Sequence, residues 1–193
     1  MRRLTPAIVL TCVLTWVLAF VALTAAVPVA SASNGLPAKK VWLSDVSTAM
    51  HGSQAYLRAR IADAQPGQRL AINLDIDNTS LATKYAPGKP ILVVRSFTRY
   101  AHEHGVAVFF NTGRGPAAAA QARRLLRQAG YTVDRLCGRR NGEALVHSKK
   151  RCRSSFAAAG YTIVANVGNR STDFAGSGYG RAFKLPNYGN RLG

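Results

Sequence analysis

The sequence has few acidic residues and no histidine pattern typical of a metal site. Its 193 residues contain 8 Asp and Glu against 26 Lys and Arg, and its 4 histidines show none of the spacings of metal ligands. A histidine-bound metal is therefore not predicted, and we expect these histidines at the surface. Internal repeats and low-complexity tracts are also absent, which leaves one domain as the natural interpretation of this length.

The shortage of acids gives a formal charge of +18. A field of this sign attracts anionic ligands and polyanionic surfaces, including phosphate esters, nucleic acids and acidic cell-wall polymers. A solvated basic surface without a dedicated partner explains the same charge at least as well as specific nucleic-acid binding, which we do not predict.

The N-terminal segment has the pattern of a secretory signal peptide. Arg2 and Arg3 precede an apolar run over residues 7–29, and Ala30-Ser31-Ala32 then forms a cleavage site. Cleavage after Ala32 would export a chain without a membrane anchor, with 24 Lys and Arg against 8 Asp and Glu, a formal charge of +16. The alternative is an uncleaved anchor, because the run approaches the roughly 20 residues that span a bilayer. We expect residues 33–40 to form a flexible leader and residues 41–193 to form the folded domain.

Cysteine is equally scarce. Cys12 lies in the signal segment, so Cys137 and Cys152 are the only thiols of the exported chain. An oxidising compartment permits a disulfide between them, and its loop of about 15 residues would contribute roughly 3 kcal/mol to stability. Two separate buried thiols are the alternative, since the sequence does not supply the Cα separation.

Hydrophobic periodicity predicts alternating helices and strands. Strands are expected at residues 70–74, 106–110, 131–136 and 161–167, with a fifth at 181–185. Helices are expected at residues 41–64, 90–104, 116–130 and 143–159. This alternation predicts an α/β fold with a parallel sheet of about five strands and helices on both faces. In such folds the ligand crevice lies at the carboxyl ends of the strands.

Two aspartates follow the first predicted strand, at that end of the sheet. Asp75 and Asp77 are two residues apart, so their side chains lie on the same side of an extended chain. Carboxylates this close repel one another unless a cation lies between them, and Mg²⁺ suits their oxygen atoms. One carboxylate can then attack phosphorus while the other transfers a proton. The alternative, that the aspartates merely end the strand and cap a turn, is disfavoured because the chain has so few acids.

This segment resembles the first motif of the haloacid dehalogenase-like (HAD) superfamily. Asp75-Ile76-Asp77-Asn78-Thr79 matches the pattern D-x-D-x-T, and both its continuation Ser80-Leu81-Ala82-Thr83 and the tail Phe183-Lys184-Leu185-Pro186-Asn187 are similar to secreted acid phosphatases of the class B and plant-type branch. The resemblance covers nearly the whole exported chain. It implies a Rossmann-like three-layer sandwich, with Asp75 as nucleophile and Asp77 as general acid and base. The short interval before the next motif leaves little room for a large cap domain, so we expect an open site that accepts varied leaving groups.

Two further stretches are similar to the second and third motifs. The resemblance implies that Thr112 hydrogen-bonds the phosphoryl group, that Gly113 permits close backbone approach and that Arg114 adds positive charge. The third motif is a lysine that neutralises charge on the nucleophile and the phosphate oxygens. Counting back to the family's K-S-x-x-R pattern selects Lys149, while Lys150 leaves a shift by one residue open.

The fourth motif departs from the family pattern. The family has G-D-x-x-x-D where this chain has Gly168-Asn169-Arg170-Ser171-Thr172-Asp173. The resemblance implies that Mg²⁺ is held by the side chain of Asp75, the backbone carbonyl of Asp77 and Asp173. Asn169 is a further candidate ligand whose amide oxygen brings no charge, so a lower metal affinity is expected.

These residues predict a secreted, Mg²⁺-dependent acid phosphatase that hydrolyses small-molecule phosphate monoesters through an aspartyl-phosphate at Asp75. One alternative is a specialised nucleotidase or a phosphotransferase. A second alternative is a catalytically weak cationic protein of HAD-like fold that binds polyanions.

Overall fold

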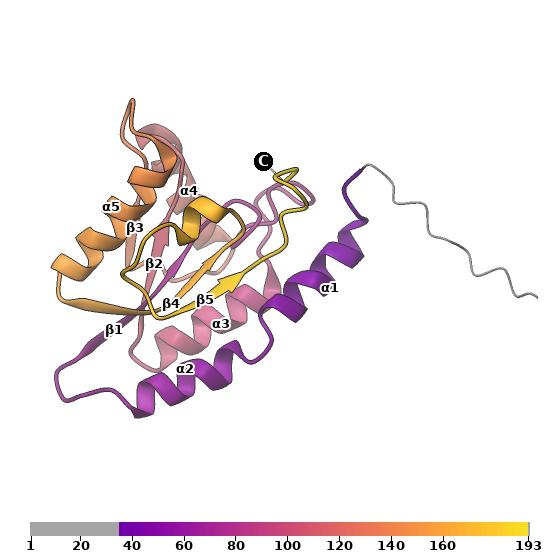
Figure 1. Cartoon of the computed structure of the whole chain (residues 1–193). Coiled ribbons are helices and arrows are strands. Elements are labelled where there is room, and N and C mark those ends of the chain that lie inside the picture. Colours follow the sequence, from indigo (N-terminus) through magenta and orange to yellow (C-terminus); the bar gives the residue numbers. More distant parts are fainter. Residues whose placement is uncertain (1–34, 193) are drawn as a thin grey trace, which may run out of the picture. The chain divides into compact units, whose positions relative to one another are not determined.

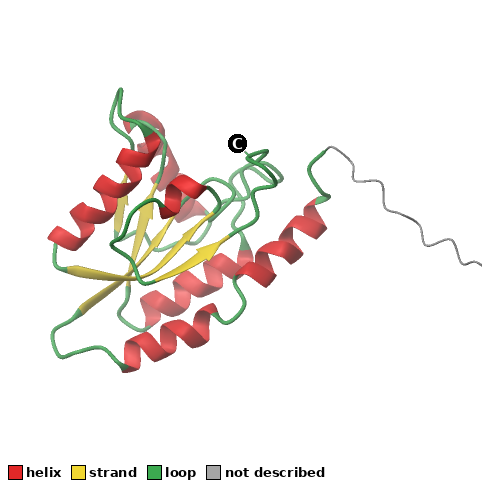
Figure 2. Cartoon of the chain, viewed as in Figure 1, coloured by secondary structure: helices red, strands yellow, loops and turns green. Residues whose placement is uncertain are grey.

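The computed structural model describes residues 35–192, and the predicted signal peptide and Cys12 lie outside this range (Figures 1 and 2). Five strands form one parallel sheet in the order β3-β2-β1-β4-β5. The strands are β1 (Arg69–Leu74), β2 (Ala107–Asn111), β3 (Arg135–Cys137), β4 (Tyr161–Gly168) and β5 (Arg181–Lys184). The predicted α/β fold with a five-stranded parallel sheet is confirmed.

Helices cover both faces of this sheet. They are α1 (Lys39–Ala49), α2 (Ser53–Ala62), α3 (Leu92–Glu103), α4 (Pro116–Gln128) and α5 (Leu145–Ala158), and a short 3₁₀ helix, η1, spans Ser171–Phe174. Side chains of α1 to α4 pack in one apolar cluster with Ile72 and Val108, whereas Phe156 of α5 packs with Ala71 and Phe109 in a second cluster. Neighbouring strand residues point to opposite faces, so α5 lies on the face opposite to α3 and α4. No helix between residues 35 and 192 is long and apolar enough to cross a bilayer.

Two predicted elements differ from the structure. The helix expected over residues 41–64 is divided into α1 and α2, because Gly52 adopts a left-handed conformation with φ 73° between them. The first of these helices begins at Lys39, inside the range expected to be a leader, and Leu36 packs against the core. The strand expected over residues 131–136 is reduced to β3, and the hydroxyl of Tyr131, before it, donates a hydrogen bond to the backbone oxygen of Ser80 at 2.6 Å.

The strand register brings three chain segments to the same edge of the sheet. Leu74, the last residue of β1, pairs with Phe110 in β2 and with Val167 in β4. The residues that follow these three therefore lie side by side where β1, β2 and β4 end. The chain leaves β1 toward β2 and returns beside β1 only at β4, so the strand order reverses here, which is where open α/β sheets bind ligands.

A disulfide links the edge of the sheet to α5. Cys137, at the end of β3, is bonded to Cys152, and their Cα atoms are 5.7 Å apart. The alternative of two separate thiols is therefore excluded, and the loop that follows β3 is held against α5.

Candidate active site

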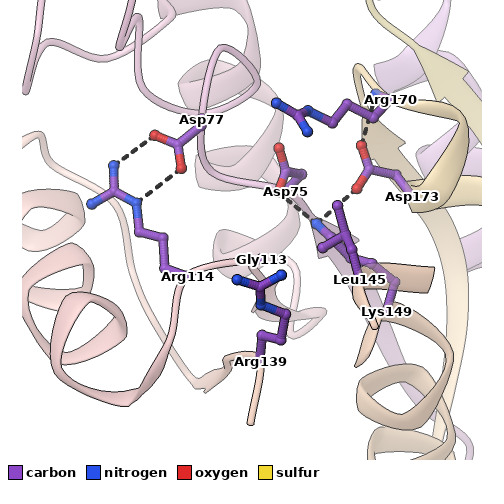
Figure 3. A pocket seen from close by; sticks show the side chains of 9 residues that line it. All are labelled: Asp75, Asp77, Gly113, Arg114, Arg139, Leu145, Lys149, Arg170 and Asp173. Carbon is purple, nitrogen blue, oxygen red and sulfur yellow. Dashed lines mark hydrogen bonds and ion pairs between the residues drawn. The ribbon is translucent and has the colours of Figure 1, made fainter. Parts of the chain in front are cut away.

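A pocket of about 260 Å³ opens at the carboxyl ends of the central strands (Figure 3). The residues that line it are Asp75, Asp77, Gly113, Arg114, Arg139, Leu145, Lys149, Arg170 and Asp173. Six of the sequence-predicted site residues, Arg114 included, are thus brought to one pocket from α5 and from the segments that follow β1, β2 and β4. The other two, Thr112 and Asn169, are buried and do not line it.

Lys149 lies at the centre of this arrangement. Its ammonium nitrogen lies 2.6 Å from Oδ1 of Asp75 and 2.7 Å from Oδ1 of Asp173, and it donates a hydrogen bond to the backbone oxygen of Asn111 at 2.5 Å. Burial lowers the pKa of Lys149, but the two carboxylates outweigh burial and raise it above its usual value. Lys150 is exposed, so Lys149 is the lysine that contacts the first aspartate.

Asp75 is held as a buried carboxylate at the end of β1. Its Oδ2 accepts a hydrogen bond from the hydroxyl of Thr79 at 3.3 Å, and its backbone oxygen accepts one from the hydroxyl of Ser80 at 2.7 Å. Burial raises the pKa of Asp75 to about 6; Lys149 opposes this shift and the charge of Asp173 adds to it. The carboxylate therefore ionises near neutral pH with its lysine partner in place.

Asp77 lies at the mouth of the pocket with different partners. Both of its carboxylate oxygens accept hydrogen bonds from the Arg114 guanidinium, at 2.9 and 2.6 Å, and the hydroxyl of Thr83 donates to Oδ1 at 2.8 Å. Burial alone would raise the pKa of Asp77, but the hydrogen bonds from Arg114 and Thr83 outweigh it and lower the pKa. The contact with Thr83 was not predicted, because it depends on the path of the following turn.

A tight turn over residues 76–81 follows Asp75 and carries Asp77. The backbone oxygen of Ile76 accepts hydrogen bonds from the amides of Thr79, Ser80 and Leu81. Asn78 adopts a left-handed conformation with φ 53°, which asparagine tolerates better than most residues. Its side chain accepts a hydrogen bond from the amide of Lys84 at 2.8 Å and donates one to the backbone oxygen of Leu192. The turn is thereby fixed at both ends, and Asp75 points inward while Asp77 faces Arg114.

Asp173 is positioned by the backbone at the end of β4. Its Oδ2 accepts hydrogen bonds from the amides of Asn169 at 3.1 Å and Arg170 at 2.9 Å, which leaves Oδ1 for Lys149. A Cβ atom on Gly168 would lie 2.5 Å from the Asp173 side chain, so glycine is required for this approach.

Arg153 supports Asp173 from the protein interior. Its guanidinium donates hydrogen bonds to the backbone oxygens of Asp173 at 2.8 Å, of Ser177 at 3.3 Å and of Ala175. The sequence motif contained Arg153 but gave no indication of this anchoring role.

The second motif places its threonine behind the pocket surface. The hydroxyl of Thr112 accepts a hydrogen bond from the amide of Arg114 at 3.2 Å, and the amide of Thr112 donates one to the backbone oxygen of Cys137 at 3.0 Å. A Cβ atom on Gly113 would lie 2.7 Å from Cδ1 of Leu145, so glycine allows this strand end to lie against the start of α5.

The oxygen atoms around the pocket suit a hard cation, although their arrangement differs from a simple carboxylate cluster. No three His, Cys, Asp or Glu side chains of residues 35–192 come together as a metal site, because Asp77 turns toward Arg114 and Asp173 is occupied by Lys149 and backbone amides. Oδ1 of Asn169, by contrast, is buried without a hydrogen-bond partner. A buried, unpartnered amide oxygen next to this pocket fits Mg²⁺ or one of its waters. All four histidines are exposed, as predicted.

Sequence and structure comparisons agree on the family. The family described as HAD superfamily, subfamily IIIB (Acid phosphatase), matches residues 82–191, which begin just beyond Asp75 and Asp77. No curated protein matches the sequence. The class C acid phosphatase from Bacillus anthracis has a similar structure, with a TM-score of 0.62 and 17% identity over 79% of this chain and 80% of that one. The crystal structure of the same enzyme with tungstate bound gives a TM-score of 0.62 at 16% identity over the same shares. Because the family match covers more than half of the chain, the protein belongs to subfamily IIIB of the HAD superfamily, the acid phosphatases.

Proposed function

We propose that the protein is a Mg²⁺-dependent phosphomonoesterase that acts through an aspartyl-phosphate at Asp75. The observation that carries this proposal is the buried contact of Lys149 with both Asp75 and Asp173 in the pocket wall. A lysine held in this way stabilises the ionised nucleophile and then the negative charge of the phosphoryl group. The family assignment supports a phosphate monoester as substrate.

The reaction divides into two displacements on phosphorus. A carboxylate oxygen of Asp75 attacks phosphorus, the bond to the ester oxygen breaks, and that oxygen takes a proton from Asp77 as the alcohol leaves. Asp77, now ionised, takes a proton from water as the water oxygen attacks phosphorus, and the bond between phosphorus and the Asp75 oxygen breaks. Inorganic phosphate leaves, and both aspartates regain their starting states.

Asp77 must release Arg114 before it can carry a proton. In the structure both Asp77 oxygens are bonded to the guanidinium, which favours the ionised carboxylate. Phosphate oxygens compete for the same donor, since a guanidinium binds phosphate and carboxylate with the same two-pronged geometry. Substrate binding thus transfers Arg114 from Asp77 to the phosphoryl group, so the pKa of Asp77 rises. Asp77 then takes up a proton from solvent and can pass it to the ester oxygen.

The residues proposed to hold Mg²⁺ are the carboxylate of Asp75, the backbone carbonyl of Asp77 and the carboxylate of Asp173, with the side chain of Asn169 as a further candidate ligand. When bound, the ion would neutralise charge on the phosphate oxygens. Asp173 also positions Lys149, since its carboxylate contacts that ammonium and two backbone amides. Neutral Asn169 predicts weaker metal binding than an aspartate at this position would give.

We also propose that the protein is exported after cleavage near Ala32 and acts outside the cytoplasm. The signal-peptide pattern of residues 1–32 and the disulfide between Cys137 and Cys152 support this proposal.

The decisive experiment measures hydrolysis of a chromogenic phosphate ester by the purified protein, with Mg²⁺ or with EDTA. Asp75→Asn should abolish turnover, and EDTA should suppress it. Asp63→Asn, which removes an exposed acid at the end of α2, serves as the control and should keep full activity. Equal rates for the Asp75→Asn and unmodified proteins would refute the proposal. Negligible hydrolysis by the unmodified protein, together with salt-sensitive polyanion binding that survives Asp75→Asn, would favour a binding protein instead.

A further inference from the structure

The pocket holds more positive charge than the proposed chemistry uses. Four of its lining side chains are cationic and three are carboxylates. Lys149 is paired with Asp75 and Asp173, and Arg114 is paired with Asp77. The side chains of Arg139 and Arg170, by contrast, form no ion pair with any carboxylate of residues 35–192.

These two arginines come from different sides of the pocket. Arg170 follows β4 and precedes η1, whereas Arg139 lies in the loop after β3 (Figure 3). Both guanidinium groups belong to the pocket wall, so a ligand bound at Asp75 meets both of them. A single phosphoryl group already has Lys149 and Arg114 as partners, which leaves Arg139 and Arg170 for another part of the substrate.

The loop that carries Arg139 is held in place. The Arg139 amide donates a hydrogen bond to the backbone oxygen of Arg114 at 2.9 Å, and Arg151 donates one to the backbone oxygen of Gly138 at 2.8 Å. A Cβ atom on Gly138 would lie 2.9 Å from the Arg114 backbone oxygen, so the loop packs tightly against the second motif. The disulfide at Cys137 adds a covalent restraint. These contacts fix the backbone from which the Arg139 side chain extends, so binding an anion there does not require the loop itself to be ordered.

Positive charge continues beyond the pocket on this loop and on the neighbouring helices α4 and α5. A neighbouring hollow of about 370 Å³ shares Arg139 with the pocket and is also lined by Arg123, Arg140 and Arg151. Arg151 is paired with Glu143, but Arg123 and Arg140 form no ion pair among the described residues. A leaving group that extends from the reacting phosphate over this loop therefore enters a strongly positive region.

We propose that Arg139 and Arg170 bind a second phosphate group carried by the leaving group, so that the preferred substrates are phosphate monoesters with a further phosphate near the scissile one. A dianionic phosphate balances two guanidinium groups, each of which can donate two parallel hydrogen bonds to it. This inference rests on the proposed phosphatase activity and specifies its substrate class.

A matched pair of nucleotides tests the proposal. Thymidine 5′-monophosphate and thymidine 3′,5′-bisphosphate differ only in the second phosphate, and release of the first phosphate gives kcat/KM for each. We expect kcat/KM for the bisphosphate to exceed that for the monophosphate by about fivefold or more, the size of a favourable partly exposed ion pair. Arg139→Gln and Arg170→Gln should each reduce this ratio by at least half.

The control separates local recognition from the general attraction of a cationic protein. Arg124 is exposed on α4, outside the pocket, and Arg124→Gln removes the same charge. The ratio should be unchanged in Arg124→Gln. A ratio near one in the unmodified protein, or an equal fall in Arg124→Gln and Arg139→Gln, would overturn the proposal.

Binding to the Asp75→Asn protein, measured by calorimetry, tests the arginines without turnover. The bisphosphate should bind about five times more tightly than the monophosphate, and the added substitution Arg139→Gln should remove most of this preference. Equal affinities would overturn the second-phosphate site even if both nucleotides are hydrolysed. Absence of hydrolysis of either nucleotide would instead overturn the phosphatase activity itself.

Discussion

Replacement of Lys149 by methionine tests the central contact of the site. Methionine has a similar length and no charge, so it fills the same space while it leaves two carboxylates facing each other. Lys149 is only 2% exposed, and its ammonium lies within 2.7 Å of a carboxylate oxygen from Asp75 and from Asp173. The backbone oxygen of Asn111 would also lose its hydrogen-bond donor.

Burial sets the size of the expected effect. Removing one partner of a buried ion pair costs about 3–5 kcal/mol, because the remaining charge is left without compensation. Domains of this kind are stable by only about 5–15 kcal/mol, so the loss is a large fraction of the total. For a domain of this length the melting temperature should fall by on the order of 10 °C.

Thermal unfolding of Lys149→Met in EDTA at neutral pH measures this loss, with Lys150→Met as the matched control. Lys150 is the next residue on the same helix but is exposed, so its replacement should change the melting temperature by less than about 2 °C. Hydrolysis of a phosphate ester should fall sharply in Lys149→Met alone. The double replacement Asp75→Asn with Lys149→Met should recover part of the lost stability, since it removes one of the two facing charges. Equal melting temperatures for the two single lysine variants would refute the reasoning.

Three further predictions concern the pH dependence and the disulfide. The pKa of Asp75 is about 6 in the folded protein against its ordinary 3.8. The stability that this group contributes is therefore fully present below pH ~4 and is lost as pH rises through about 6. Asp75→Asn should flatten this part of the curve of unfolding free energy against pH, measured in EDTA. Arg114→Gln removes the hydrogen bonds that lower the pKa of Asp77, so that pKa should rise and the basic limb of kcat/KM should move to higher pH. Serine at both Cys137 and Cys152 should lower the unfolding free energy by about 3 kcal/mol, measured by denaturant unfolding.

Each of these three predictions has an outcome that would contradict it. An identical pH dependence of stability with and without the Asp75 carboxylate would show that burial does not shift its pKa. Arg114→Lys keeps the charge but loses the paired hydrogen bonds, so a basic limb in the same place for Gln, Lys and the native residue would contradict the assignment of Asp77. Denaturation midpoints that agree between the serine variant and the oxidised protein would show that the crosslink does not restrain the unfolded chain.

The meeting of Asp75, Lys149 and Asp173 follows from the sequence because parallel strands end at one edge of the sheet. The choice between Lys149 and Lys150 did not follow, because it depends on the rotation of α5 about its own axis. Neighbouring residues on a helix point about 100° apart, so only one of the two can face the first aspartate. A shift of α5 by one residue would have placed Lys150 instead of Lys149 next to Asp75. The rotation of α5 about its axis is fixed only by its packing in the structure.

The places of Arg139 and of Arg114 could not be predicted in the same way. The loop after β3 has no hydrophobic periodicity, and its path is set by the close approach of Gly138 and by the disulfide. The hydrogen bonds between Arg114 and Asp77 depend on the turn at Asn78. The left-handed conformation of Asn78 could not be predicted from the sequence, because the motif does not specify it. Local propensity likewise did not reveal the break at Gly52, since the apolar spacing continues across it.

The sheet margins have a consequence for association between copies of the protein. The outermost strands, β3 and β5, are three and four residues long, and they carry the exposed cations Arg135, Arg181 and Lys184. Short, positively charged edge strands pair poorly with an incoming strand, because they expose few unpaired backbone N–H and C=O groups and because like charges repel. Copies of the protein at high local concentration should therefore resist aggregation by strand addition.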